Sequence, residues 1–194
     1  MRRMARTVRM LSAFVVAGVL LAGCGPLDDM KGPGGVVAGM NMQGAAEHAD
    51  AMLYATVGAI KPEIVWVHDT TTTGSCDVTR YWVVMTVVSE ERRGSFLGVV
   101  ERFWKKSGYK ITGMHASKER PRLYAVSPEG FGISLVFGYK GQAFFEVTTP
   151  CVDKSEVTGP EKPSNGPTYE GDVPTPDVRS DFWSATTPVP GPSS

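Results

Sequence analysis

The sequence predicts an α+β fold in which two helices pack on an antiparallel sheet of about five to six strands. Three observations support this fold class: helical periodicity occurs twice, six short runs are rich in β-branched and aromatic residues, and turn sequences separate the last of these runs. The expected element order is α-β-β-α-β-β-β-β. We expect one globular domain over residues 44–151, between a flexible linker (24–43) and a proline-rich disordered tail (152–194).

The first half of the domain is expected to contain a helix and two strands. Apolar residues recur at intervals of three and four over residues 45–60, and Pro62 ends this helix because proline cannot donate a backbone hydrogen bond. Residues 63–69 alternate in polarity and predict the first strand. Residues 80–89 are apolar on both faces, which predicts a central strand that is covered on two sides.

The second helix is predicted by an apolar stripe at helical spacing, which consists of Phe96, Val99, Val100, Phe103 and Trp104. We expect Ser95 to begin or cap this helix and Gly108 to follow its end. Four further strands are predicted at residues 110–117, 122–126, 132–138 and 143–149. Short turn sequences at 127–130 and 139–142 join successive strands, which indicates an antiparallel meander.

The N-terminus has the three parts of an export signal. Residues 1–9 carry four arginines and no acid, residues 10–22 are apolar, and small residues precede Cys24. The run Leu21-Ala22-Gly23-Cys24 resembles the lipobox of bacterial lipoproteins. The resemblance implies that residues 1–23 are removed and that Cys24 carries a diacylglycerol, which anchors the chain on the extracytoplasmic face of the cell membrane. The alternative is an ordinary signal peptide with a chance cysteine. Arg2-Arg3 raises the twin-arginine route, but the residues that follow fit that motif poorly, so we expect the general secretory route.

The arrangement of signal, linker and one small domain resembles the uncharacterised small lipoproteins of high-GC Gram-positive bacteria, and this likeness implies no catalytic residue. Once Cys24 is assigned to the lipid, Cys76 and Cys151 remain. An exported chain is in an oxidising compartment, so we expect these two to form a structural disulfide. A reactive or metal-bound pair of thiols is the alternative.

The sequence contains no recognisable catalytic motif. Gly94 and Gly98 flank Ser95 at the wrong spacing for a nucleophile elbow. The strand carboxylates Glu63, Asp69 and Glu146 are interpreted as solvated positions. His68, Asp69 and His115 would form a polar cluster only if their strands were adjacent, and surface histidines are the default interpretation. We therefore expect no metal and no cofactor.

Basic residues are concentrated in the second half of the domain. Formal net charge is zero over all 194 residues, which gives no indication of nucleic-acid binding. One hypothesis is a basic surface that faces anionic lipid headgroups or wall polymer. Its expected members are Arg102, Lys105, Lys106, Lys118, Arg120 and Arg122. A solvated helix face is the simpler interpretation, and the acidic tail could also fold over these residues.

The tail holds eight of the 14 prolines and one apolar spot, Phe182-Trp183, which is either incidental or a docking motif. The leading functional hypothesis is a non-enzymatic, membrane-anchored accessory or binding domain whose partner is an envelope protein or a cell-wall polymer. The alternatives are an envelope enzyme with an unrecognised site and a structural lipoprotein that binds anionic wall polymer.

Overall fold

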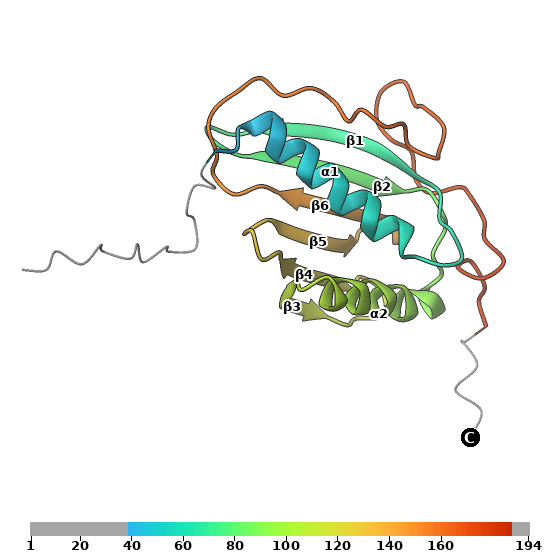
Figure 1. Ribbon diagram of the computed structural model, residues 1–194. Helices are drawn as coiled ribbons and strands as arrows, with labels where there is room; N and C mark the ends of the chain where they lie inside the picture. The colour runs from blue at the N-terminus through green and yellow to red at the C-terminus, as the bar shows by residue number, and fades with distance from the viewer. Residues whose placement is uncertain (1–38, 188–194) are drawn as a thin grey trace, which may run out of the picture. The chain divides into compact units, whose positions relative to one another are not determined.

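The computed structural model describes residues 39–187 and confirms the predicted α+β fold and its element order (Figure 1). The signal segment, Cys24 and most of the predicted linker lie outside the described residues. The elements are α1 (Met42–Gly58), β1 (Trp66–Thr73), β2 (Val78–Val84), α2 (Glu90–Lys106), β3 (Lys110–His115), β4 (Arg122–Val126), β5 (Gly132–Phe137), the short 3-10 turn η1 (Tyr139–Gly141) and β6 (Ala143–Thr148).

The six strands form one antiparallel sheet in the order β1-β2-β6-β5-β4-β3. The last four strands make a meander, as predicted, but β3 does not follow β2 in space. The chain crosses the sheet through α2 instead, and β6 returns to pair with β2. The final strand is therefore interior, and β1 and β3 are the two edges.

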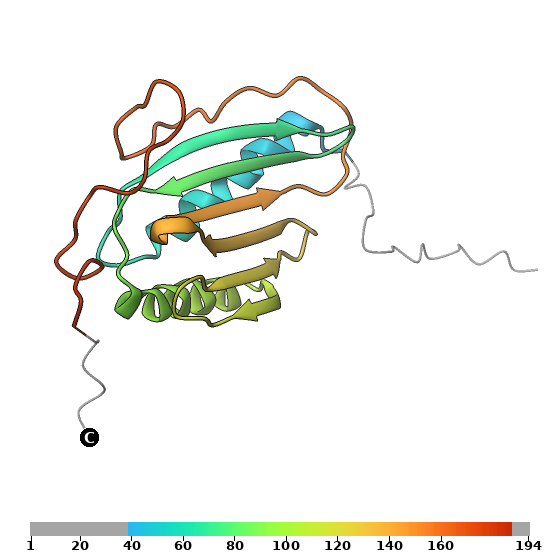
Figure 2. The ribbon, with the colours of Figure 1, turned by 180° about the vertical axis from the view of Figure 1, so that it is seen from behind.

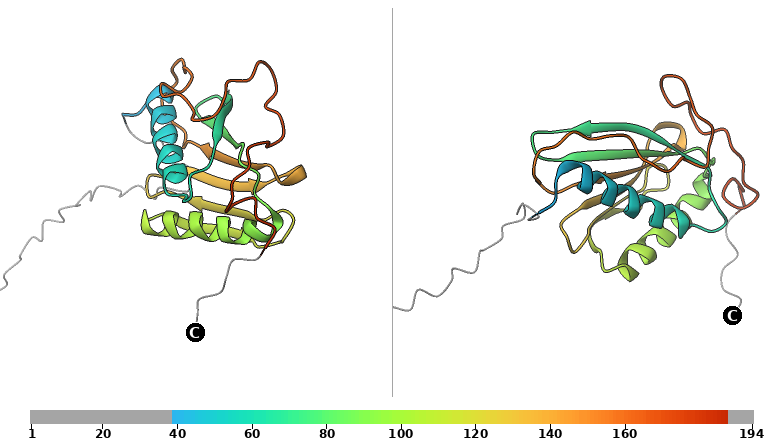
Figure 3. Two further views of the ribbon diagram at one scale, coloured as in Figure 1. Left: turned by 90° about the vertical axis from the view of Figure 1, so that its right-hand side faces the viewer. Right: turned by 45° about the horizontal axis from the view of Figure 1, so that its top comes forward.

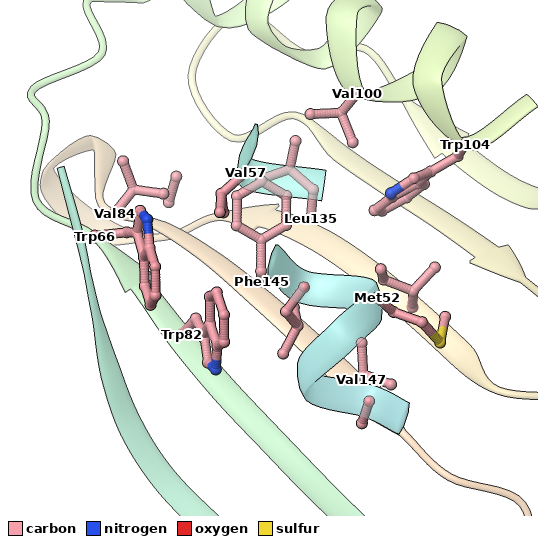
Figure 4. Packing of buried hydrophobic residues seen from close by; sticks show 14 of the residues in the cluster. Met52, Val57, Trp66, Trp82, Val84, Val100, Trp104, Leu135, Phe145 and Val147 are labelled. Carbon is pink, nitrogen blue, oxygen red and sulfur yellow. The ribbon is translucent and has the colours of Figure 1, made fainter. Parts of the chain in front are cut away.

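Both helices cover the same face of the sheet, α1 over β2 and β6 and α2 over β3 and β4 (Figures 1 and 2). Large apolar side chains fill the space between these layers, among them Trp82, Phe145 and Leu135 (Figure 4). The Trp104 indole Nε1 donates a hydrogen bond of 3.1 Å to the Thr56 hydroxyl. The two helices are thus joined by a polar contact inside an otherwise apolar core, which satisfies both groups.

Several element boundaries differ from those expected, and the largest differences are in β1, β2 and α2. β1 continues to Thr73 because Thr71, Thr72 and Thr73 stay in register with β2, and β-branched threonines favour that extended conformation. β2 ends at Val84, and α2 begins at Glu90 after Ser89, earlier than the predicted start at Ser95. Two glutamates in the first turn of α2 interact favourably with the positive end of the helix dipole.

A disulfide joins Cys76 to Cys151, as predicted. Cys76 lies in the β1–β2 connection and Cys151 follows β6, and their Cα atoms are 4.8 Å apart. β2 and β6 are neighbours in the sheet, and the Val152 N–H donates to the Cys76 carbonyl at 2.7 Å. The bond therefore closes a separation of 75 residues at one end of the β2–β6 pair.

The prediction of a disordered tail is wrong for residues 152–187, although they contain neither helix nor strand. Val152 and Trp183 have 3% and 0% of their surface exposed. The Trp183 indole packs against Phe96 and donates a 2.7 Å hydrogen bond to the Pro62 carbonyl. Trp183 is thus part of the core rather than an exposed docking residue, and the predicted domain boundary at 151 does not mark the end of the packed structure.

The tail also covers part of the sheet face that the helices leave free (Figure 3). Three of its apolar residues, Tyr169, Val173 and Val178, pack on a small second cluster that is formed by Val67, Val83 and Met85. The low apolar content of this segment predicts disorder only if its few large side chains find no site to fill. Here the sheet supplies such sites, so burial offsets the entropy lost on ordering.

Candidate functional site

A buried ion pair lies between α1 and the sheet. Asp50 of α1 and Arg80 of β2 approach to 3.2 Å, and their side chains are only 9% and 1% exposed. The Arg80 guanidinium also donates to the Thr71 hydroxyl at 2.7 Å and to the Thr158 carbonyl at 2.8 Å. Arg80 therefore connects α1, both strands of the first hairpin and the tail.

The hydrogen bonding of these two side chains is incomplete. Asp50 Oδ1 and Arg80 Nε are buried and have no hydrogen-bond partner among the described residues. Burial raises the pKa of the Asp50 carboxyl to about 6, although the charge of Arg80 opposes this shift. An ionised carboxylate with a free oxygen in such surroundings gains from any added hydrogen-bond donor.

Four aromatic side chains from α1, β1 and β2 pack on one another and form a cluster near the pair. The indoles of Trp66 and Trp82 stack with centroids 4.0 Å apart, and the ring of Tyr54 meets Trp82 edge-on at 4.6 Å. His68 lies 5.0 Å from the Trp82 ring. Its pKa is lowered by burial and, secondarily, by the charge of Arg80. Figure 4 shows Trp66 and Trp82 side by side in the core.

The phenol of Tyr54 connects this aromatic cluster to the tail. Its hydroxyl donates to the Lys162 carbonyl at 2.6 Å and lies 3.4 Å from His68 Nε2. The Lys162 ammonium lies over the Tyr54 ring, 5.4 Å from its centroid. The same tyrosine thus contacts both the backbone and the charged end of one tail lysine.

A pocket of about 90 Å³ opens beside the ion pair, between α1 and the tail. Its lining residues are Glu47, Asp50, Ala51 and Tyr54 on one side and Gly159, Glu161 and Lys162 on the other. The α1 residues have the spacing i, i+3, i+4 and i+7, which places them on one face of the helix. We call this cavity the Asp50 pocket. Its wall holds three carboxylates and one ammonium group, so it favours a cation.

The predicted polar cluster of His68, Asp69 and His115 is not formed. His68 and Asp69 belong to β1 and His115 to β3, and these strands are the two opposite edges of the sheet. Five strand spacings separate them, about 24 Å. His68 and Asp69 instead line a groove with tail residues such as Tyr169, and within residues 39–187 no group of three potential metal ligands occurs.

The predicted basic surface is divided between the two ends of α2. Lys105 and Lys106 lie in the last turn, whereas Lys118 lies 3.9 Å from Glu90 and Glu91 in the first turn. The helix is about 25 Å long, so these charges do not form one cluster. The six expected members, Arg102, Lys105, Lys106, Lys118, Arg120 and Arg122, are all exposed.

Sequence reasoning missed both Asp50 and Arg80. Each interrupts an apolar pattern, Asp50 on the inner face of α1 and Arg80 at the start of a strongly apolar run. Two opposite charges in separate apolar elements are the signal that could have identified them, since a buried charge requires a partner. The contribution of the tail had no such signal, because it depends on backbone groups of Thr158 and Lys162.

No helix in the described part of the chain is long and apolar enough to cross a membrane. No family model matches the sequence, and no curated protein matches it. Among solved structures, the chain is similar to the crystal structure of a DUF4853 family protein from Actinomyces odontolyticus ATCC 17982. The identity is 13% and the TM-score 0.30, over 69% of this chain and 72% of that chain, and a likeness at this level carries no functional argument.

Proposed function

We propose that this chain is a lipid-anchored accessory domain on the extracytoplasmic face of the cell membrane, and that it binds a ligand rather than transforming one. The anchoring part depends on the resemblance of Leu21-Ala22-Gly23-Cys24 to a lipobox. The Cys76–Cys151 disulfide supports export, because such bonds persist in oxidising compartments.

The binding part depends on one observation: Asp50, which lines the Asp50 pocket, has a buried carboxylate oxygen with no hydrogen-bond partner in the described part of the chain. A free acceptor beside a cavity favours a ligand that donates a hydrogen bond. The lining residues offer carboxylates, a phenol and an ammonium group, which can form hydrogen bonds or ion pairs with a small polar ligand.

Membrane fractionation tests the anchor. Cys24→Ala is expected to move the chain out of the membrane fraction, since the thiol that would carry the lipid is gone. Asp29→Ala, outside the lipobox, is the matched control and should leave fractionation unchanged. A Cys24→Ala chain that remains in the membrane fraction in normal amount would contradict the anchoring part of the proposal.

Ligand binding is tested by NMR titration of the full chain with a panel of small acidic, basic and neutral compounds. We expect at least one compound to shift backbone resonances of residues 47–54 together with those of residues 159–162, because these segments form the two walls. Binding should be weakened by Asp50→Asn. A panel that produces no saturable shifts in these segments would contradict the binding part.

A further inference from the structure

We propose that the Asp50 pocket binds the ammonium group of a small primary amine, with the Asp50 carboxylate as hydrogen-bond acceptor and the Tyr54 ring as a cation–π surface. This inference rests on the proposed binding function and specifies its ligand class. The chain already holds one ammonium group at this place, that of Lys162, which occupies the site until an external amine displaces it.

The Asp50 carboxylate can accept a further hydrogen bond. One of its oxygens meets Arg80, while the other has no partner among residues 39–187, in a side chain that is nine-tenths buried. The anion therefore has unused capacity to accept a charge-assisted hydrogen bond, which is stronger than a neutral one. An alkylammonium group has three donors and can supply that bond.

The Tyr54 ring offers an aromatic face to a cation. The Lys162 Nζ lies 5.4 Å from the centroid of the Tyr54 ring, within the usual range for a cation–π contact. Tyr54 is kept in place by edge-on contacts with Trp66 and Trp82 and by its hydroxyl bond to the Lys162 carbonyl. That bond uses the lysine backbone, so the ammonium can leave the ring without loosening the tyrosine.

The charges around the pocket favour a cation over an anion. Glu47 and Glu161 are exposed carboxylates on opposite walls of the pocket, and among residues 39–187 Lys162 is the one basic residue that lines it. Arg80 pairs with Asp50 and so neutralises only one of the three acids. A cation that replaces the lysine side chain therefore enters a wall with a residual negative charge, whereas an anion would meet repulsion.

The test is an NMR titration of the full chain in detergent micelles at pH 7 with propylammonium chloride, 1-propanol and tetramethylammonium chloride. 1-Propanol has the same shape without the charge, and tetramethylammonium has the charge without N–H donors. We expect saturable shifts at residues 47–54 and 159–162 with propylammonium, weaker ones with tetramethylammonium, and none with 1-propanol. Equal responses to propylammonium and 1-propanol would overturn the inference.

Amino-acid substitutions separate the contributions of Lys162 and Asp50 to propylammonium binding. Lys162→Ala removes the internal ammonium and should tighten propylammonium binding about two- to fivefold. The matched control Lys154→Ala, an exposed tail lysine away from the pocket, should not change it. Asp50→Asn should weaken binding about tenfold or more. If Lys162→Ala binds propylammonium with unchanged affinity, the proposed displacement of Lys162 is overturned. This affinity can be measured even if Asp50→Asn fails to fold.

The two proposals fail separately. If other compounds of the panel shift the walls of the pocket while propylammonium does not, the pocket binds a ligand but not an amine, and only the inference is overturned. If no compound shifts these walls, the proposed binding function itself is overturned.

Discussion

The side-chain amide of Asn165 pairs with the backbone of β1 at Trp66 as a neighbouring strand would. Its oxygen accepts the Trp66 N–H at 2.9 Å, and its nitrogen donates to the Ile64 carbonyl at 2.9 Å. The next residue, Gly166, donates its N–H to the Trp66 carbonyl at 3.1 Å. The tail thus caps the beginning of the edge strand β1, where backbone groups would otherwise be free to pair with other chains.

Removing this edge cap should destabilise the protein. Asn165→Ala leaves the Trp66 N–H and the Ile64 carbonyl without their partners, and we expect a loss of about 1–3 kcal/mol in the free energy of unfolding. Chemical denaturation measures the loss, and amide hydrogen exchange should show faster exchange at Trp66. Asn41 is not a suitable control because it caps α1, so Thr175→Ala, an exposed tail position, serves instead. Unchanged exchange at Trp66 would refute the edge contact.

Gly166 should not tolerate a side chain. A Cβ there would lie 2.7 Å from Val67 Cγ1 and 2.9 Å from the Trp66 carbonyl oxygen, and the backbone oxygen cannot move aside cheaply. Gly166→Ala is therefore expected to detach this part of the tail from β1 and to lower the midpoint of thermal unfolding. Gly159→Ala is the matched control, since its Cβ would meet nothing within 4 Å. Equal melting temperatures for the two variants would show that the close approach of Gly166 to β1 does not contribute to stability.

Trp183 should contribute to stability as a core residue. Trp183→Ala removes a fully buried indole, for which losses of about 3–5 kcal/mol are usual. The half-buried neighbour Phe182 should matter less when changed to alanine. Denaturant titration compares the two variants, and a Trp183→Ala chain as stable as the wild type would mean that the tail is not packed in solution.

The disulfide should stabilise the fold by restricting the unfolded chain. For a loop closed over 75 residues, the entropy model gives about 4–5 kcal/mol as an upper figure. The double variant Cys76→Ser, Cys151→Ser should unfold at correspondingly lower denaturant concentration. Mass spectrometry after alkylation without reductant provides the direct check, and two alkylated thiols in the exported protein would disprove the bond.

Asp50 should make stability depend on pH between about 4 and 6. Its pKa rises from 3.8 when unfolded to about 6 when folded, so the folded chain binds the proton more tightly. Its contribution is therefore greatest below pH 4 and is lost as the pH rises through 6, by at most about 3 kcal/mol. The lowered pKa of His68 has the opposite effect on stability. Below the usual pKa of histidine the folded chain binds this proton less tightly than the unfolded chain, so this contribution to stability rises with pH.

The measurement is the difference in unfolding free energy between Asp50→Asn and the wild type at pH 4 and pH 7, which cancels the contributions of other groups. We expect the variant to gain stability relative to the wild type as the pH rises. A difference that stays constant between the two pH values would mean that the carboxyl is not shifted by burial.

The sequence by itself determined the secondary structure and its order. The stripe Phe96 to Trp104 and the β-branched runs have periods that depend only on local geometry, so they could be read without knowing which elements meet. The pairing of Cys76 with Cys151 also followed from the sequence, because only two cysteines remained after Cys24 was assigned to the lipid. The lipobox stays a prediction from residues 21–24.

Only the tertiary structure decided which strands are neighbours and what the tail does. The insertion of β6 beside β2 places His68 and His115 at opposite edges of the sheet, a long-range choice that no local pattern specifies. The same choice brings Asp50, Arg80 and Thr158 together from three distant segments. The tail, poor in apolar residues, is ordered because the folded sheet offers it a backbone edge and a cavity for Trp183, and such sites exist only once the rest of the chain has folded.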